Sequence, residues 1–141
     1  MLFLKLGGSL ITDKLRPETV RAETLARLAQ EIASAWPSLE ATGLRVGHGS
    51  GSFGHVAAAR HGTHRGVASR EDWRGFAEVW RATNRLHRLV VDALAEAGLP
   101  ALSFPPSAAA LAEDGDLVAL ADEPIRLAVS NGLLPVVAGD V

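Results

Sequence analysis

The 141-residue chain contains no cysteine, which excludes disulfide bonds and thiolate zinc sites, and we expect a cytoplasmic protein. Long apolar runs are also missing. The apolar start at residues 1–4 is too short for a signal peptide or a membrane span, and charges interrupt the alanine-rich stretches. The net charge of −2 gives no excess of positive charge for nucleic acid or anionic lipid. We therefore expect neither a nucleic-acid partner nor a membrane partner.

The remaining composition is globular, with 48% hydrophobic and 21% charged residues, and the length suits one domain. Short apolar runs alternate with amphipathic stretches. Fully apolar strands of this kind are typical of a parallel sheet. The sequence therefore predicts an α/β fold, a three-layer sandwich with a mostly parallel central sheet. Strands are expected at 2–6, 44–47, 101–104 and 133–138, an edge strand at 117–120, helices at 21–36, 53–60, 69–97 and 124–130, and a helical turn at 107–111.

Two glycine-rich segments follow the first two predicted strands. The first is K-L-G-G-S at 5–9, with Lys14 shortly after it, and the second is H-G-S-G-S-F-G-H at 48–55. Gly139 and Asp140 follow the last strand. The carboxyl ends of parallel strands meet at one sheet edge, so these segments should converge there. Exposed glycine N–H groups beside lysine bind phosphate, and two such loops favour phosphoryl transfer.

The second loop also matches the G-x-G-x-x-G pattern of dinucleotide-binding folds. That function requires an acidic residue at the end of a strand about 20 residues later. Glu71 and Asp72 lie at this distance, but they begin a long predicted helix. The chain has no G-x-x-x-x-G-K-[ST] motif either, so a Walker loop is excluded. We disfavour dinucleotide binding.

The five histidines invite different interpretations. We expect His48, at a strand end, to be structural, with its ring hydrogen-bonded to the backbone. His55 follows the second glycine loop and is placed to donate to a phosphate oxygen. His61, His64 and His87 have no second ligand at metal-site spacing, so we treat them as surface or loop residues lining the substrate entrance. No metal-ligating cluster is predicted.

The long helix is expected to begin at Ser69, which forms a weak capping box with Asp72. Its aromatic residues Trp73, Phe76 and Trp80 are most simply core residues. A less favoured interpretation makes one helix face the wall of an apolar substrate pocket.

The motifs resemble those of the amino acid kinase superfamily, and within it the isopentenyl phosphate kinases. The chain reads K-L-G-G-S-L-I-T-D-K at 5–14, and 48–55 differs by one residue from the family's H-G-G-G-S-F-G-H. The ending G-D-V at 139–141 also matches. The resemblance implies ATP-dependent phosphorylation of isopentenyl phosphate to isopentenyl diphosphate, with Mg²⁺ bridging the ATP oxygens and no protein nucleophile.

The resemblance also implies site residues. Lys14 would stabilise the transition state together with Lys5 and His55. Apart from the resemblance, Asp140 at a strand end is placed to orient Lys5 or Lys14 or to assist Mg²⁺, and its plainer interpretation is a turn aspartate. The residues implied for the ATP phosphates are Lys5, Gly7, Gly8, Ser9 and Gly51. Those implied for the acceptor phosphate are Ser50, Gly54 and His55.

Two features depart from the family. Ser50 stands where glycine is usual; its Cβ disfavours a positive φ and would crowd the phosphate, whereas its hydroxyl would add a donor. The family's C-terminal nucleotide lobe is absent, so we expect 1–141 to be the N-terminal acceptor-binding lobe of a longer homodimeric enzyme and to be inactive or very weak alone. Two alternatives remain: a kinase for another phosphate or phosphonate such as fosfomycin, and a non-catalytic ligand-binding domain of the same fold.

Overall fold

A parallel sheet of four strands forms the centre of the computed structural model, which describes residues 1–139. The strand order is β1 (Leu2–Leu6), β2 (Leu44–His48), β6 (Leu134–Ala138) and β3 (Ala101–Ser103). Every neighbouring pair is parallel, which confirms the predicted sheet. Asp140, for which we predict a supporting role, lies outside the described residues.

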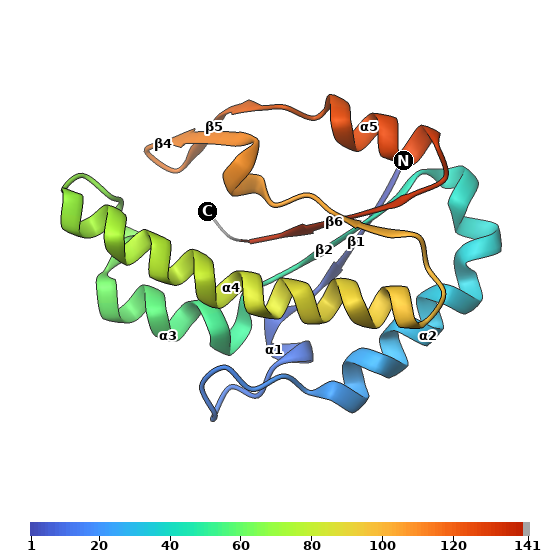
Figure 1. The fold of residues 1–141 in the computed structure, drawn as a ribbon, viewed down its shortest axis with the longest axis horizontal. Helices are drawn as coiled ribbons and strands as arrows, with labels where there is room; N and C mark the ends of the chain where they lie inside the picture. The colour runs from blue at the N-terminus through green and yellow to red at the C-terminus, as the bar shows by residue number, and fades with distance from the viewer. Residues whose placement is uncertain (140–141) are drawn as a thin grey trace.

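Helices lie on both sides of this sheet and make three layers (Figure 1). One side carries α2 (Ala22–Leu39) and α4 (Arg70–Glu96), with α3 (Gly51–His61) packed along α4. The other side carries α5 (Glu123–Ser130). A single helical turn, α1 (Gly8–Ile11), follows β1, where we expected only a loop. Short 3-10 turns cover 40–42, 63–65 and 106–108.

The core forms between the sheet and the helices α2 and α4. Alternate residues of the strands point to this side, because strand side chains alternate between faces. Each large aliphatic side chain buried here stabilises the fold by about 1.5–3 kcal/mol. The buried residues are Leu44 and Val46 of β2, Leu134 and Val136 of β6, Leu25, Ala29 and Ile32 of α2, and Leu86, Val90 and Leu94 of α4.

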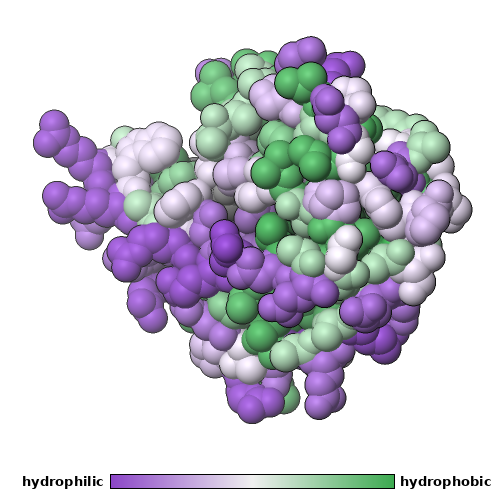
Figure 2. All heavy atoms as spheres, turned by 45° about the vertical axis from the view of Figure 1, so that its right-hand side comes forward, coloured by the Kyte–Doolittle hydropathy of each residue, from purple (hydrophilic) through white to green (hydrophobic). Residues whose placement is uncertain are grey.

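The opposite side of the sheet is less covered. Phe3 of β1 is 53% exposed, and Leu102 of β3 and Leu127 of α5 are also exposed. Figure 2 shows apolar atoms at the surface between hydrophilic ones on the side of the molecule that carries α2 and α5. Within residues 1–139, no helix is long and apolar enough to cross a membrane.

Helix α4 begins as the sequence predicts. The Asp72 N–H donates to Ser69 Oγ at 3.1 Å, and the Ser69 N–H donates to Asp72 Oδ2 at 2.8 Å. These hydrogen bonds with Ser69 lower the pKa of the Asp72 carboxyl. The helix ends at Glu96, and Gly98 follows with a φ of +90° that suits glycine.

Three elements differ most from the prediction. Helix α2 continues through Pro37 to Leu39, although proline has no N–H to donate to the Ala33 carbonyl one turn earlier. The helical turn expected at 107–111 is only a short turn at 106–108, followed by β4 (Ala110–Glu113). The edge strand expected at 117–120 exists as β5 (Asp116–Leu120), but it pairs antiparallel with β4 and not with the central sheet.

Candidate active site

The two glycine loops touch at the carboxyl ends of β1 and β2. The Gly49 N–H donates to the Leu6 carbonyl at 3.1 Å. A Cβ at Gly8 would lie 2.5 Å from Gly51 N, a distance that no side chain allows, and Gly51 has a φ of +50°. Glycine is therefore required at position 8 for close approach and at position 51 for the left-handed backbone. The predicted convergence of the loops is confirmed.

Thr12 joins the two loops through its hydroxyl group. The side chain is fully buried. Its Oγ1–H donates to the Gly8 carbonyl at 2.7 Å, and Oγ1 accepts the Ser52 N–H at 3.0 Å. The sequence analysis did not single out this residue, because nothing in the sequence pairs positions 12 and 52.

Several backbone donors remain available where the loops meet. Within residues 1–139, no hydrogen bond engages the N–H groups of Gly8, Ser9, Ser50 or Gly51. Ser50 and Gly51 also open helix α3, whose dipole favours an anion at this end. The arrangement can bind phosphate through backbone N–H groups.

The two predicted lysines are exposed, and neither forms an ion pair with a carboxylate of the described chain. Lys5 lies on β1 opposite Gly47. Lys14 lies in a loop closed by an antiparallel bridge between Thr12 and Val20. Both ammonium groups are therefore available to a ligand.

The loop of Lys14 is fixed at several points. The Asp13 carboxylate accepts the Leu15 N–H and Arg16 Nε, both at 2.9 Å, and these hydrogen bonds lower the pKa of Asp13. Arg85 of α4 donates from Nε to the Glu18 carboxylate at 3.0 Å. Glu18 has a left-handed φ of +48°, which is uncommon for a residue with a side chain.

His55 lies on α3 with an exposed side chain. Its Nδ1 is 2.7 Å from the Gly51 carbonyl, and a carbonyl only accepts, so Nδ1 carries the proton. Nε2 is left for a ligand. A neutral ring offers only a lone pair there, so His55 donates to phosphate from Nε2 only as the imidazolium.

Ser50 fits its position without backbone strain. Its φ of −72° and ψ of −17° are right-handed, so the positive φ that a serine would resist falls on Gly51 instead. A Cβ at Gly54 would lie 2.5 Å from Ser50 Oγ and 2.8 Å from Thr83 Cγ2. The Gly54 N–H donates to the Ser50 carbonyl. Gly54 thus lets α3 pack closely against α4, and its predicted contact with substrate stays a prediction.

His48 has the structural environment that the sequence predicts. Its Nδ1 donates to the Gly49 carbonyl at 3.1 Å, and its Nε2 lies 2.8 Å from His87 Nδ1. The expectation that His87 is a surface or loop residue is wrong. His87 is 3% exposed on α4, since it falls on the same helix face as Thr83 and Val90. Burial, and secondarily the neighbouring His48, lowers its pKa to about 4.

The aromatic residues of α4 are not core residues, contrary to our main expectation. Trp73 is 55% exposed and Trp80 is 39% exposed. Phe76, Ala77 and Trp80 instead line a mostly apolar groove of about 370 Å³ with Ser107 and Ala108, and Trp80 Nε1 donates to Ser107 Oγ at 2.8 Å. This arrangement matches the less favoured interpretation, an apolar wall on one face of the helix.

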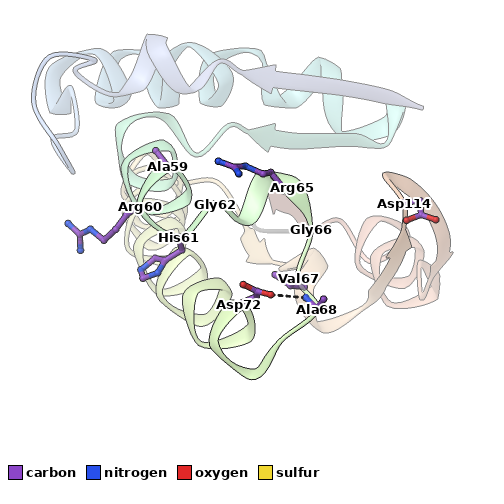
Figure 3. Close-up of a pocket in the computed structure, with 10 residues that line it drawn as sticks. All are labelled: Ala59, Arg60, His61, Gly62, Arg65, Gly66, Val67, Ala68, Asp72 and Asp114. Atoms are coloured by element: carbon purple, nitrogen blue, oxygen red, sulfur yellow. Dashed lines mark hydrogen bonds between the residues drawn. The ribbon is translucent and has the colours of Figure 1, made fainter.

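A larger hollow of about 680 Å³ lies at the far end of α3, between α3, the start of α4 and the tip of the β4–β5 hairpin (Figure 3). Arg60 points outward from it, and Asp72 is occupied by the helix cap. The charged side chains do not converge on one point. We assign no site to this hollow.

Metal binding by side chains has no support in the described part of the chain. No three His, Asp or Glu side chains of residues 1–139 gather closely enough to hold an ion. The available donors are N–H groups and ammonium groups, which suit phosphate oxygens.

The sequence profile of the amino acid kinase family matches residues 1–141. The chain belongs to the amino acid kinase family. Isopentenyl phosphate kinases of Methanothermobacter thermautotrophicus and Haloferax volcanii are 39% and 40% identical to it over its whole length. The chain spans about half of these relatives, 53% and 55%.

Solved structures agree with this assignment. An isopentenyl phosphate kinase structure covers 98% of the chain with a TM-score of 0.87 and 38% identity, and the chain spans 57% of it. The Thermoplasma acidophilum isopentenyl phosphate kinase product complex covers all of the chain with a TM-score of 0.83 and 33% identity, and the chain spans 56% of it. Aspartate kinase from Synechocystis, at 17% identity and a TM-score of 0.64, shares the fold.

Proposed function

We propose that this chain is the acceptor-binding part of an ATP-dependent kinase that converts isopentenyl phosphate to isopentenyl diphosphate. The observation that carries the proposal is the direct contact between the two glycine loops, with His55 beside one of them and, nearby in the chain, two lysines that have no carboxylate partner among residues 1–139. The two relatives named above, both isopentenyl phosphate kinases, support the choice of acceptor.

In this proposal, the first loop together with Gly51 holds the ATP phosphates, and the other residues of the second loop hold the acceptor phosphate. Gly7, Gly8, Ser9 and Gly51 donate to the ATP phosphates, together with Lys5. The N–H of Ser50 and the imidazolium of His55 hold the acceptor phosphate. Gly54 supports this subsite by letting the loop approach α4. Mg²⁺, when bound to ATP, neutralises part of the charge on its phosphate oxygens.

The chemistry then needs no protein nucleophile. An oxygen of the acceptor phosphate attacks the γ-phosphorus of ATP, and the bond to the ADP oxygen breaks. Two unit negative charges 4 Å apart repel by about 4 kcal/mol at an effective dielectric constant of 20. Lys5 and Lys14 offset repulsion of this size, and Lys14 neutralises charge that develops on the transferred group.

The groove formed by Phe76, Ala77 and Trp80 supports a hydrocarbon tail on the acceptor. A five-carbon isopentenyl group gains from burial at about 0.8 kcal/mol per CH₂ group. Fosfomycin is small and polar, so a pocket for it would be small and lined by polar side chains. The lining of this groove therefore supports the isoprenoid acceptor over the phosphonate.

We further propose that residues outside this chain hold the adenine, because the relatives are about twice as long. Residues 1–141 would then be the acceptor-binding lobe, in a cytoplasmic homodimer. Alone, the 141-residue chain should bind isopentenyl phosphate but turn it over weakly or not at all.

The test uses the full natural protein that carries this chain. Isopentenyl phosphate, isopentenol and fosfomycin are supplied with ATP and Mg²⁺, and products are followed by ³¹P NMR. We expect isopentenyl diphosphate from the first substrate alone, and a loss of kcat of about 100-fold or more in Lys14→Gln. Activity on fosfomycin alone would favour the phosphonate kinase, and unchanged activity in Lys14→Gln would favour the non-catalytic domain.

A further inference from the structure

A chain of hydrogen bonds crosses the sheet beneath α4 and ends on the second glycine loop. Ser103 Oγ lies 2.7 Å from His87 Nε2, His87 Nδ1 lies 2.8 Å from His48 Nε2, and His48 Nδ1 lies 3.1 Å from the Gly49 carbonyl. The two imidazole rings are stacked, with centroids 5.1 Å apart. Neither histidine has a role in the function proposed above.

The sheet topology explains how these residues meet. Strands β2 and β3 lie on opposite sides of β6, so their axes are about 10 Å apart. His48 pairs with Ala138 and Ser103 pairs with Val136, so both side chains share the sheet face that Val136 presents to α4. His87, on α4, lies above β6 and bridges the two strands. An exposed serine is thereby connected to the glycine loop through two buried rings.

The direction of the last hydrogen bond does not depend on protonation. The Gly49 carbonyl only accepts, so His48 Nδ1 is a donor in every state. If His48 is neutral, its Nε2 accepts from His87 Nδ1–H, and Ser103 donates to His87 Nε2. If His48 is charged, His48 Nε2–H donates to His87 Nδ1 and His87 Nε2–H donates to Ser103 Oγ. His48 Nδ1–H still donates to the Gly49 carbonyl.

Anchoring this carbonyl also orients the next N–H group. The Gly49 carbonyl and the Ser50 N–H belong to one planar trans peptide, so they point in opposite directions. Fixing the carbonyl toward His48 therefore turns the Ser50 N–H away from the core. That N–H has no hydrogen bond within residues 1–139.

We propose that His48 and His87, steadied by Ser103, are positioning residues that aim the Ser50 N–H at the acceptor phosphate. The proposal rests on the function proposed above, in which position 50 holds that phosphate. The two histidines touch no substrate. They restrict the rotation of one peptide plane, and so they set the geometry of a single donor.

The test compares three variants with the wild type in the full natural protein. His87→Phe removes the partner of His48 and keeps the bulk of the ring. His87→Gln keeps a donor and an acceptor. Val90→Ala opens a cavity on the same buried helix face without touching the hydrogen bonds, so it controls for loss of stability.

We expect His87→Phe to raise the KM for isopentenyl phosphate about tenfold, the cost of one weakened hydrogen bond to a charged group. The KM for ATP should change less than about twofold, and His87→Gln should recover most of the affinity. An unchanged KM in His87→Phe, or an equal rise in Val90→Ala, overturns the proposal.

NMR of the 141-residue chain separates this proposal from the proposed function. We expect ¹⁵N shifts that identify His48 as protonated at Nδ1, and a displaced Ser50 amide signal in His87→Phe but not in Val90→Ala. Failure of the wild type to bind isopentenyl phosphate overturns the proposed function and with it the acceptor as the target of the Ser50 N–H, whereas the orientation of that N–H by the histidines is judged by the Ser50 signal. A Ser50 signal that does not move in His87→Phe overturns the positioning proposal.

Discussion

Replacing Thr12 with valine tests whether one hydroxyl group holds the two glycine loops together. Valine has nearly the same shape, so the substitution removes the hydroxyl without opening a cavity. The Ser52 N–H loses its acceptor, since its only hydrogen bond within residues 1–139 is to Thr12 Oγ1. The Gly8 carbonyl loses one of two donors and keeps the backbone N–H of Thr12 at 2.9 Å.

The size of the effect follows from these partners. A buried donor without an acceptor costs about 1–3 kcal/mol, and an ordinary hydrogen bond is worth about 1 kcal/mol. Thr12→Val should therefore lower the free energy of unfolding by about 2–4 kcal/mol. Thr12→Ser keeps the hydroxyl and loses one buried methyl group, which costs about 1 kcal/mol.

Urea unfolding of the 141-residue chain measures both variants, with the fluorescence of its three tryptophans as the signal. Phosphate binding adds a second measurement, because separated loops no longer present their N–H groups together. We expect Thr12→Val to weaken phosphate binding and Thr12→Ser to keep it. Equal stability of the two variants would refute the inference that the hydroxyl, and not the shape of the side chain, joins the loops.

Three further predictions concern pH, the acceptor and the Lys14 loop. The pKa of His87 is about 4 in the folded chain against 6.5 unfolded, so the unfolded state binds more protons between these values. Stability should fall as pH drops from 6.5 to 4, by at most about 1.4 kcal/mol per pH unit, and urea titrations of His87→Phe should show a flatter dependence. His55→Ala should weaken isopentenyl phosphate binding more than ATP binding, because the side chain is proposed to contact only the acceptor phosphate, and calorimetry with each ligand measures the two affinities. Arg85→Ala should free the loop held through Glu18 and lower kcat severalfold, with a change in unfolding free energy of no more than about 1 kcal/mol; a kcat equal to wild type would contradict this role.

The elements that the sequence predicts well are those with a local signal. Strands of a parallel sheet are mostly apolar, as in β6, and glycine marks the loops that follow β1, β2 and β6. The contact between Gly8 and Gly51 could be inferred because parallel strands end at the same sheet edge. The capping box at Ser69 is visible within four residues. These features need no knowledge of distant contacts.

The features that escaped prediction depend on residues far apart in the chain. Thr12 and Ser52 are separated by 40 positions, and His48 and His87 by 39. No local pattern marks such pairs, although His87 does fall at helical spacing among buried residues of α4. The β4–β5 hairpin was missed despite a usable local signal. Asp114 and Gly115 both have positive φ, as a two-residue hairpin turn requires, and Asp-Gly is a typical sequence for that turn.

Helix α4 has a consequence for how this protein can change by mutation. It is 27 residues long, about 40 Å, and it carries Trp80 at the apolar groove, Arg85 at the Lys14 loop and His87 beneath the second glycine loop. A shift of the helix moves all three groups together. Substitutions that widen the groove for longer acceptors should therefore show epistasis with substitutions in either loop. Under the proposed function, acceptor length and phosphate alignment are therefore coupled traits, and selection for one would have to compensate the other.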